Sequence, residues 1–215
     1  MVYVYAADVS QLPDPKEFPE VLKGLLEERK QKTLRCIRPD SRKQSLGAGL
    51  LLRYVLHLHG ITQEDIRCGE NGKPEVHGIC FNLSHSHNMV VCAVSERAVG
   101  CDIEKIADAR EHLAERFFCK EEISHLETFV NTERDSEFFR LWTMKESYMK
   151  MTGEGMRLPL NRFELLLGDT VKVRRDGVID SCFIKEYDIP GYRLTVCGKE
   201  AEFAEEVEYV AVEVM

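Results

Sequence analysis

The sequence predicts an α+β fold made of two similar halves. Strand-like and helical segments come in clusters rather than in the strict alternation of a parallel α/β protein. One strand and two helices precede three strands, and three helices then precede a strand-rich end. The 215 residues suffice for one large domain or two small, closely packed ones. We expect the halves at 1–100 and 101–215.

The first half is expected to open with a strand over 2–9. Apolar residues at helical spacing predict a helix over 16–36, whose basic end suits a helix C-terminus. Asp40 or Ser41 is expected to cap a longer helix that runs to Leu58. After a turn-rich segment, apolar runs predict strands over 79–83, 89–95 and 99–103.

The second half is expected to begin with three helices. Their apolar spacing places them over 107–118, 120–130 and 133–152. Gly153 and Gly155 are expected to end the last helix, and the segment from Phe163 onward is rich in predicted strands.

Composition and charge exclude several classes of protein. Hydrophobic residues make up 44% and charged residues 31%, which excludes global disorder and collagen-like or low-complexity architecture. The net charge of −8 argues against a general nucleic-acid-binding protein. Between Arg29 and Arg53, however, eight basic residues accompany Asp40 alone, which gives a local charge of +7. We expect an anion-binding patch on an otherwise acidic body.

The cysteines and the lack of long apolar runs predict a soluble cytoplasmic protein. None of the eight cysteines forms a Cys-x-x-Cys metal motif, and we expect buried, reduced thiols. Met1–Tyr5 does not suggest a signal peptide. The apolar run Leu46–Leu52 is far shorter than the roughly 20 residues that span a bilayer.

The most informative segment is the helix expected around 136–151. In a helical projection its apolar residues fill one broad arc, and two charged residues, Lys145 and Glu146, fall inside that arc. Burial of an unpaired charge is costly, so each needs a partner, a metal ion or a cleft. Lys150 lies one turn after Glu146 on the same side. A structural ion pair with a solvated lysine explains this helix equally well.

Asp102 and Glu104 form a second pattern. In a strand they point to the same side, while Cys101 and Ile103 pack behind them. Neighbouring carboxylates repel unless a cation or proton lies between them, and their oxygens suit Mg²⁺. A polar strand face explains the pair equally well. Together with Glu146, the pair predicts a cation site closed by three carboxylates from two elements.

Donors for an anion follow an apolar strand at Phe81-Asn-Leu-Ser-His-Ser-His87. Ser84, His85 and Ser86 can donate to phosphate, whereas nothing near His85 and His87 completes a zinc site. No Ser or Cys is paired with a base. The attacking group of any reaction is therefore expected to belong to the substrate.

The loop 69–74 has the glycines of a phosphate-binding loop. Pro74 stands where that motif needs Ser or Thr after its lysine, so a nucleoside-triphosphate site is not expected. The turn can still present Lys73 to another anion.

These segments together resemble the 4′-phosphopantetheinyl transferases, of the larger type that activates nonribosomal peptide and polyketide synthases, such as surfactin synthetase. The shared motifs occur in the family's order and spacing: Gly72-Lys-Pro74, Phe81-Asn-Leu-Ser-His-Ser86, Gly100-Cys-Asp-Ile-Glu104, Arg116-Phe-Phe118, Leu141-Trp-Thr-Met-Lys-Glu-Ser-Tyr-Met-Lys150 and Gly153-Glu-Gly155. The resemblance covers about residues 70–165, and the basic region agrees more loosely.

The resemblance implies an enzyme that moves phosphopantetheine from coenzyme A to a serine of an apo acyl or peptidyl carrier protein and releases adenosine 3′,5′-bisphosphate. It also implies a monomer whose halves are related by a pseudo-twofold axis, with the site at their junction. Coenzyme A and the carrier are the implied partners, without nucleic acid or membrane. Because carrier proteins are acidic, the basic patch suits both partners.

Motif positions also imply roles for individual residues. The ligands of Mg²⁺, or of Mn²⁺ in its place, correspond to Asp102, Glu104 and Glu146. Lys150 corresponds to the lysine beside the transferring phosphate, and Glu122 to a candidate general base, with a metal-bound water as the alternative. The contacts to coenzyme A correspond to Arg29, Lys32, Lys43, Lys73, Ser84 and His85.

Two other functions are consistent with the same residues. A Mg²⁺-dependent hydrolase of coenzyme A or nucleotide diphosphates would release free phosphopantetheine without any carrier. A non-catalytic module that binds coenzyme A or the carrier would show no turnover and no effect of Mg²⁺ removal.

Overall fold

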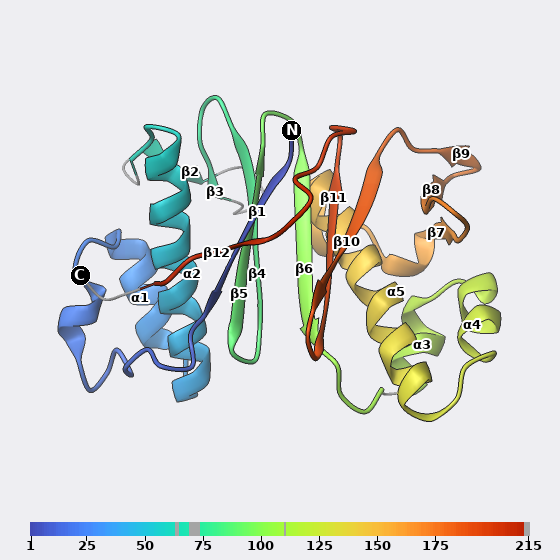
Figure 1. The fold of residues 1–215 in the computed structure, drawn as a ribbon, viewed down its shortest axis with the longest axis horizontal. Coiled ribbons are helices and arrows are strands. Elements are labelled where there is room, and N and C mark those ends of the chain that lie inside the picture. Colours follow the sequence, from blue (N-terminus) through green and yellow to red (C-terminus); the bar gives the residue numbers. More distant parts are fainter. Residues whose placement is uncertain (63–64, 69–73, 110, 213–215) are drawn as a thin grey trace.

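The structure, a computed structural model, describes residues 1–62, 65–68, 74–109 and 111–212. Within these ranges, helices and strands form the predicted α+β fold around two main sheets that lie side by side (Figure 1). The first sheet has the order β12-β1-β5-β4, with strands at Glu208–Tyr209, Tyr3–Asp8, Met89–Ser95 and Cys80–Ser86. The second has the order β10-β11-β6, with strands at Phe183–Ile189, Tyr192–Gly198 and Val99–Lys105. Neighbours are antiparallel except β12 and β1, and β12 returns the end of the chain to the first sheet.

Each main sheet packs against one long helix. α2 (Pro39–Leu58) contacts β5, β1 and β4, and α5 (Asn131–Thr152) contacts β6 and β11. The other helical elements are η1 (Pro19–Leu22), α1 (Glu27–Arg35), α3 (Glu111–Phe117), α4 (Lys120–Leu126), η3 (Gly155–Arg157) and η4 (Leu160–Arg162). Two small sheets complete the fold, one with β2 (Arg67–Cys68) and β3 (Pro74–Glu75), the other with β7 (Phe163–Leu166), β8 (Lys172–Arg175) and β9 (Val178–Ile179).

Strand β5 contributes to two hydrophobic cores. Val90 and Cys92 belong to the core beneath α2, whereas Val91 and Ala93 belong to a core shared with β6, β10 and β11. Successive side chains of a strand point to opposite faces, so a strand buried on both sides needs apolar residues at every position. All seven residues of β5 are buried, which explains the unbroken apolar run in the sequence.

The helix predicted over 16–36 is wrong in extent. The chain forms η1 and α1 instead, and Gly24 between them has φ of +75°, a left-handed conformation that interrupts a helix and favours glycine. The predicted cap at Asp40 or Ser41 is also wrong. The helix α2 begins at Pro39, whose fixed φ and missing N–H suit the first helical turn.

Several other elements are present with different ends. The helices predicted over 107–118 and 120–130 are shorter, as α3 and α4. The strands predicted over 79–83 and 99–103 continue to Ser86 and Lys105, because their backbone ladders with β5 and β11 extend that far. Gly153 ends α5 with φ of +74°, as predicted.

The seven cysteines whose side chains the structure describes are free thiols. Four of them are buried: Cys92, Cys101, Cys182 and Cys197. No helix in the described ranges combines the length and apolar character needed to cross a membrane.

A buried ion pair at the start of α2 predicts a specific sensitivity to acid. Arg42 donates through Nε to Oδ1 of Asp14 at 2.6 Å, and through a second nitrogen to Oδ2. It also donates to the carbonyl oxygens of Cys36 and Ile37, which fixes the link between α1 and α2. The hydrogen bonds from Arg42 lower the pKa of Asp14 to about 2.

We expect Asp14→Asn to remove part of the acid dependence of folding. Because the pKa of Asp14 is lower in the folded than in the unfolded chain (about 3.9), the pair stabilises the fold above about pH 4 and loses this effect as the pH falls toward 2. The free energy of unfolding, measured in urea between about pH 5 and pH 2, should therefore fall less steeply for the variant than for the wild type. Asp108→Asn, at an exposed aspartate, should keep the wild-type slope. Equal slopes for Asp14→Asn and the wild type would contradict the assignment.

Candidate active site

The facing edges of the two sheets and α5 line a cavity of about 300 Å³. The side chains around it come from β4, β6 and α5, and they are Leu83, Ser84, His85, Asp102, Glu104, Trp142, Glu146 and Lys150. Six of the predicted site residues therefore lie around one cavity, although 66 positions separate Ser84 from Lys150 in the sequence.

Gly100 allows α5 to lie directly against β6. A Cβ atom at this position would lie 2.2 Å from the carbonyl oxygen of Ser147 and 2.4 Å from the backbone nitrogen of Met151. Both contacts are to helix backbone, which cannot rotate away as a side chain can. Glycine is thus needed for the close approach that brings Lys150 to the carboxylate of Asp102.

Lys150 is held by three acceptors at the base of the cavity. Its Nζ donates to Oδ1 of Asp102 at 2.6 Å, to Oγ of Ser84 at 3.1 Å and to the carbonyl oxygen of Cys101 at 3.2 Å. Burial opposes the charge of Lys150, but the carboxylate of Asp102 outweighs it and raises the pKa of the lysine above its ordinary value. Lys150 is therefore a fixed positive charge at neutral pH.

The two glutamates of the cavity lie where burial disfavours their negative charge. Burial, and then the charge of Asp102, raises the pKa of Glu146 to about 7. Burial also raises the pKa of Glu104, whose Oε2 accepts a hydrogen bond from Ser86 at 2.7 Å. In the described part of the chain, Oδ2 of Asp102 is the buried side-chain oxygen that has no hydrogen-bond partner.

These features suit a cation. A buried carboxylate oxygen without a partner gains stability from added positive charge, and so do neighbouring acids whose pKa values are raised. As the side chains stand, no three His, Cys, Asp or Glu residues within the described ranges converge closely enough to hold a metal ion. Lys150 contacts Asp102 in this arrangement. The predicted ligand set Asp102, Glu104 and Glu146 remains a prediction.

A second cavity of about 270 Å³ adjoins the first and is basic. Arg29 and Lys32, two predicted contacts of coenzyme A, line it, and His85 and Leu83 line both cavities. Burial lowers the pKa of Arg29, and burial together with Arg29 lowers that of Lys32. Loss of hydration, and then the charge of Lys150, lowers the pKa of His85, so its imidazole is neutral at pH 7. Cations that destabilise one another in this way favour a bound anion.

Two predicted contacts of coenzyme A lie elsewhere. Lys43 is not among the residues around either cavity, and its Nζ donates to the carbonyl oxygen of Ser10 at 3.1 Å. Lys73 lies outside the described residues. Ser84 does line the cavity, but its hydroxyl is 2.8 Å from Oδ1 of Asp102. Its one proton is therefore directed to that carboxylate rather than to a phosphate of coenzyme A.

Glu122 is a structural residue in this arrangement, and the geometry does not support its predicted role as general base. Its side chain is 1% exposed and is absent from the wall of the cavity. Both oxygens accept from Nζ of Lys145, at 2.6 and 2.7 Å, and each also accepts from a backbone N–H, of Leu165 and of Cys119, at 2.8 Å. A carboxylate that accepts four hydrogen bonds has no free position for the proton of a substrate.

The two charges expected inside the apolar arc of α5 thus have different surroundings. Lys145 is fully buried and paired with Glu122, which is the structural interpretation left open by the sequence. Glu146 lines the cavity instead. Of the alternatives that the sequence offered, a partner applies to Lys145 and a cleft applies to Glu146.

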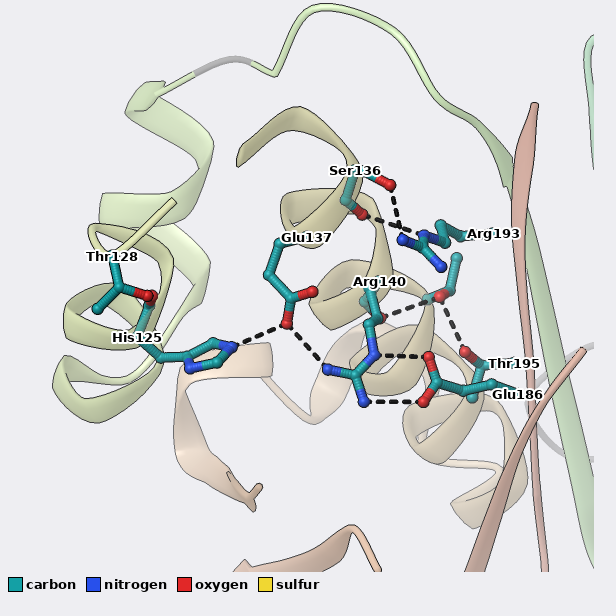
Figure 2. A network of polar contacts seen from close by, with 9 residues as sticks. His125, Thr128, Ser136, Glu137, Arg140, Glu186, Arg193 and Thr195 are labelled. Carbon is teal, nitrogen blue, oxygen red and sulfur yellow. Dashed lines mark hydrogen bonds and ion pairs between the residues drawn. The ribbon is translucent and has the colours of Figure 1, made fainter. Parts of the chain in front are cut away.

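A polar network holds the N-terminal half of α5 (Figure 2). Arg140 donates to both carboxylate oxygens of Glu186 on β10, at 2.7 and 2.8 Å, and to Oε1 of Glu137 at 2.9 Å. The same Oε1 lies 2.8 Å from Nε2 of His125 on α4. These contacts connect α5 to α4 and to the second sheet, so they fix the helix that carries three residues of the cavity.

Some residues around the cavities belong to no predicted site. Trp142 lies one helical turn before Glu146, and this spacing is the signal that could have placed it beside the cavity. Ser41 and Gln44 line the basic cavity from one face of α2, three positions apart, in the basic stretch of sequence.

Comparisons with known proteins agree with this geometry. A family model described as "4'-phosphopantetheinyl transferase superfamily" matches residues 98–197. The 4′-phosphopantetheinyl transferase Sfp of Bacillus subtilis (strain 168) is 34% identical over 201 residues, which cover 86% of this chain and 87% of the relative. The 4′-phosphopantetheinyl transferase gsp of Aneurinibacillus migulanus is 42% identical over 127 residues, which cover 58% of this chain and 54% of the relative.

Among solved structures, a holo-(acyl-carrier-protein) synthase from Bacillus anthracis str. Ames aligns with a TM-score of 0.41 and 14% identity, over 47% of this chain and 93% of that chain. The match to the Bacillus subtilis transferase extends over most of both chains at 34% identity, and it includes the motif segments that surround the cavity. It confirms what those motifs predicted: the chain belongs to the 4′-phosphopantetheinyl transferase superfamily, in its larger, Sfp-like type.

Proposed function

We propose that this protein transfers 4′-phosphopantetheine from coenzyme A to a serine of an apo acyl or peptidyl carrier protein, and that it releases adenosine 3′,5′-bisphosphate. The observation that carries the proposal is the position of Lys150 and three carboxylates beside a basic cavity. Coenzyme A has a phosphorylated nucleotide at one end and a diphosphate in the middle. The basic cavity suits the first, and the acidic cavity, with its lysine and a cation, suits the second.

The chain's own residues bind and orient the cofactor. Arg29 and Lys32 attract the phosphates of the nucleotide, and neutral His85 between the cavities can donate one N–H to a phosphate oxygen. Lys150 keeps its charge because of Asp102, so it can stabilise the negative charge that develops on the leaving nucleotide. Attack at a diphosphate depends mainly on such alignment and charge neutralisation.

Mg²⁺ is the proposed cofactor, with Mn²⁺ as a substitute, and Asp102, Glu104 and Glu146 would hold it. The partnerless Oδ2 of Asp102 and the raised pKa values of the two glutamates support this assignment. Bound there, a divalent ion supplies charge neutralisation for the diphosphate. Because Glu122 is fully bonded, the proton of the attacking serine has to leave to a group inside the cavity.

We further propose that the protein acts as a monomer in the cytoplasm, with the predicted halves 1–100 and 101–215, although β6 begins at Val99 and β12 returns to the first sheet. All residues around the basic cavity come from the first half. The second half supplies Lys150 and the three carboxylates. These positions support a reaction at the junction of the halves.

The proposal is tested by incubating the protein with apo carrier protein, coenzyme A and Mg²⁺, followed by intact-mass spectrometry of the carrier. We expect the carrier to gain one phosphopantetheine, EDTA to prevent the gain, and added Mg²⁺ to restore it. A carrier whose acceptor serine is replaced by alanine should stay unmodified. Free phosphopantetheine without a carrier would indicate the hydrolase instead, and no mass gain with a panel of carriers would contradict the transferase.

A further inference from the structure

The facing edges of the two main sheets are joined in an unusual way. Within the described residues, β4 is the last strand of the first sheet and β6 the last strand of the second, and no backbone ladder connects them. The two strands nevertheless lie in contact along their length. Polar side chains must therefore satisfy the backbone groups that a ladder would pair.

Three side chains of β4 accept hydrogen bonds from the backbone of β6 at a regular spacing. Oδ1 of Asn82 accepts from the backbone nitrogen of Cys101 at 2.9 Å. Oγ of Ser84 accepts from that of Ile103 at 3.3 Å, and Oγ of Ser86 from that of Lys105 at 3.1 Å. Positions two apart in a strand share a face, so one edge of β4 meets every second N–H of β6. We call Asn82, Ser84 and Ser86 the seam.

The two serines of the seam each hold a carboxylate of the cavity. Ser84 donates to Asp102 at 2.8 Å, and Ser86 donates to Glu104 at 2.7 Å. A serine hydroxyl has one proton, and the backbone N–H occupies one of its lone pairs. For each serine, the backbone N–H of β6 therefore fixes the position of the hydroxyl oxygen. The hydroxyl proton then points to the carboxylate of the residue that precedes this N–H in β6.

We propose that Ser86 is a positioning residue that holds Glu104 in the orientation needed to ligate the divalent cation. The inference rests on the proposed function. It assigns Ser86, which the sequence suggested as a donor to phosphate, to Glu104 instead. Through the seam, contact between the halves then sets the position of two carboxylates. Hydrogen bonds to metal-ligating carboxylates typically change metal affinity or activity by about 10–100-fold.

The test is calorimetric titration of MnCl₂ into the protein with coenzyme A present, for the wild type and three variants. Ser86→Ala should bind Mn²⁺ about 10–100-fold more weakly. Ser86→Thr, which keeps the hydroxyl, should restore most of the affinity, whereas Ser86→Cys, with a weaker donor, should not. Ser86→Ala should raise the KM for Mg²⁺ in the transfer assay while the KM for coenzyme A changes little.

Ser95→Ala is the matched control. Ser95 is a buried strand serine that accepts a backbone N–H, from Arg97 at 3.4 Å, and it lies around neither cavity. Its variant should bind Mn²⁺ as the wild type does. Thermal unfolding of all variants gives the structural cost of the hydrogen bonds that each one loses.

The outcomes separate the two proposals. Unchanged Mn²⁺ affinity in Ser86→Ala, equal weakening in Ser95→Ala, or no Mn²⁺ binding by a wild type that loads the carrier would each overturn the role of Ser86 and leave the transferase intact. A wild type that binds Mn²⁺ but loads no carrier would overturn the transferase instead. If Ser86→Ala does not fold, the comparison of Ser86→Cys with Ser86→Thr decides.

Discussion

Replacing Asp102 with asparagine is expected to reduce kcat/KM for phosphopantetheine transfer by roughly 10²–10³-fold. The carboxylate of Asp102 does two things in the cavity: Oδ1 binds Nζ of Lys150 at 2.6 Å, and the buried Oδ2 is without a protein partner. An amide removes the charge that keeps Lys150 in place and the charge available to a cation. A loss of about 3–4 kcal/mol of charge stabilisation corresponds to this change in rate.

The measurement is the initial rate of carrier loading, with the folded state checked by thermal unfolding. Asp108→Asn is the matched control, since its carboxylate is exposed and only a few positions further along the chain. Its rate should equal that of the wild type. A fully folded Asp102→Asn variant with a rate within about tenfold of the wild type would show that this carboxylate does not serve the reaction.

Replacing Glu122 with glutamine is expected to lower the free energy of unfolding by about 3–5 kcal/mol. The change leaves the ammonium of Lys145, which is 0% exposed, without its counter-charge. It also replaces one of the oxygens that accept from Leu165 and Cys119 with an amide donor. An uncompensated buried charge is among the most destabilising changes in a protein, in contrast to the removal of both partners.

Urea unfolding of Glu122→Gln, Lys145→Met and the double variant tests this pair. The double variant should recover part of the stability, because neither buried charge then remains. Glu121→Gln, at the exposed neighbouring position, should be close to the wild type.

Kinetics of Glu122→Gln then distinguish a structural residue from a base. Transfer activity should follow the folded fraction as temperature rises. A variant of wild-type stability that transfers about 10²–10⁴-fold more slowly would restore the general-base role to Glu122.

Much of the fold could be predicted because its signals are local. The apolar run of β5 and the arc of α5 gave those elements nearly their observed ends. The helix over 16–36 failed because helical spacing says little about the left-handed conformation at Gly24. The strands β4 and β6 were predicted too short because their polar ends pair with β5 and β11, and no pattern within one strand contains that pairing.

In the candidate site, too, features with local signals could be predicted and contacts between distant segments could not. Asp102, Glu104 and Glu146 were predicted from faces and periodicity, and they do surround one cavity. Lys43 was predicted from the loose agreement of the basic stretch with the family, yet its side chain donates to the carbonyl oxygen of Ser10, and it lines neither cavity. The charge pattern of the sequence indicates that a basic patch exists, but it does not indicate which of the basic side chains line a cavity.

The sequence by itself determined the chemical inventory of this protein: which faces are apolar, which charges lie on them, and which motifs occur in the order of a known family. Those properties follow from the period of a helix or a strand, so neighbouring residues suffice to define them. Only the tertiary structure decided the partners. Lys145 pairs with Glu122 and Lys150 with Asp102, although the lysines are five positions apart on one helix. Glu122 comes from α4 and Asp102 from β6, so the packing of these two elements against α5 determines which acid each lysine meets.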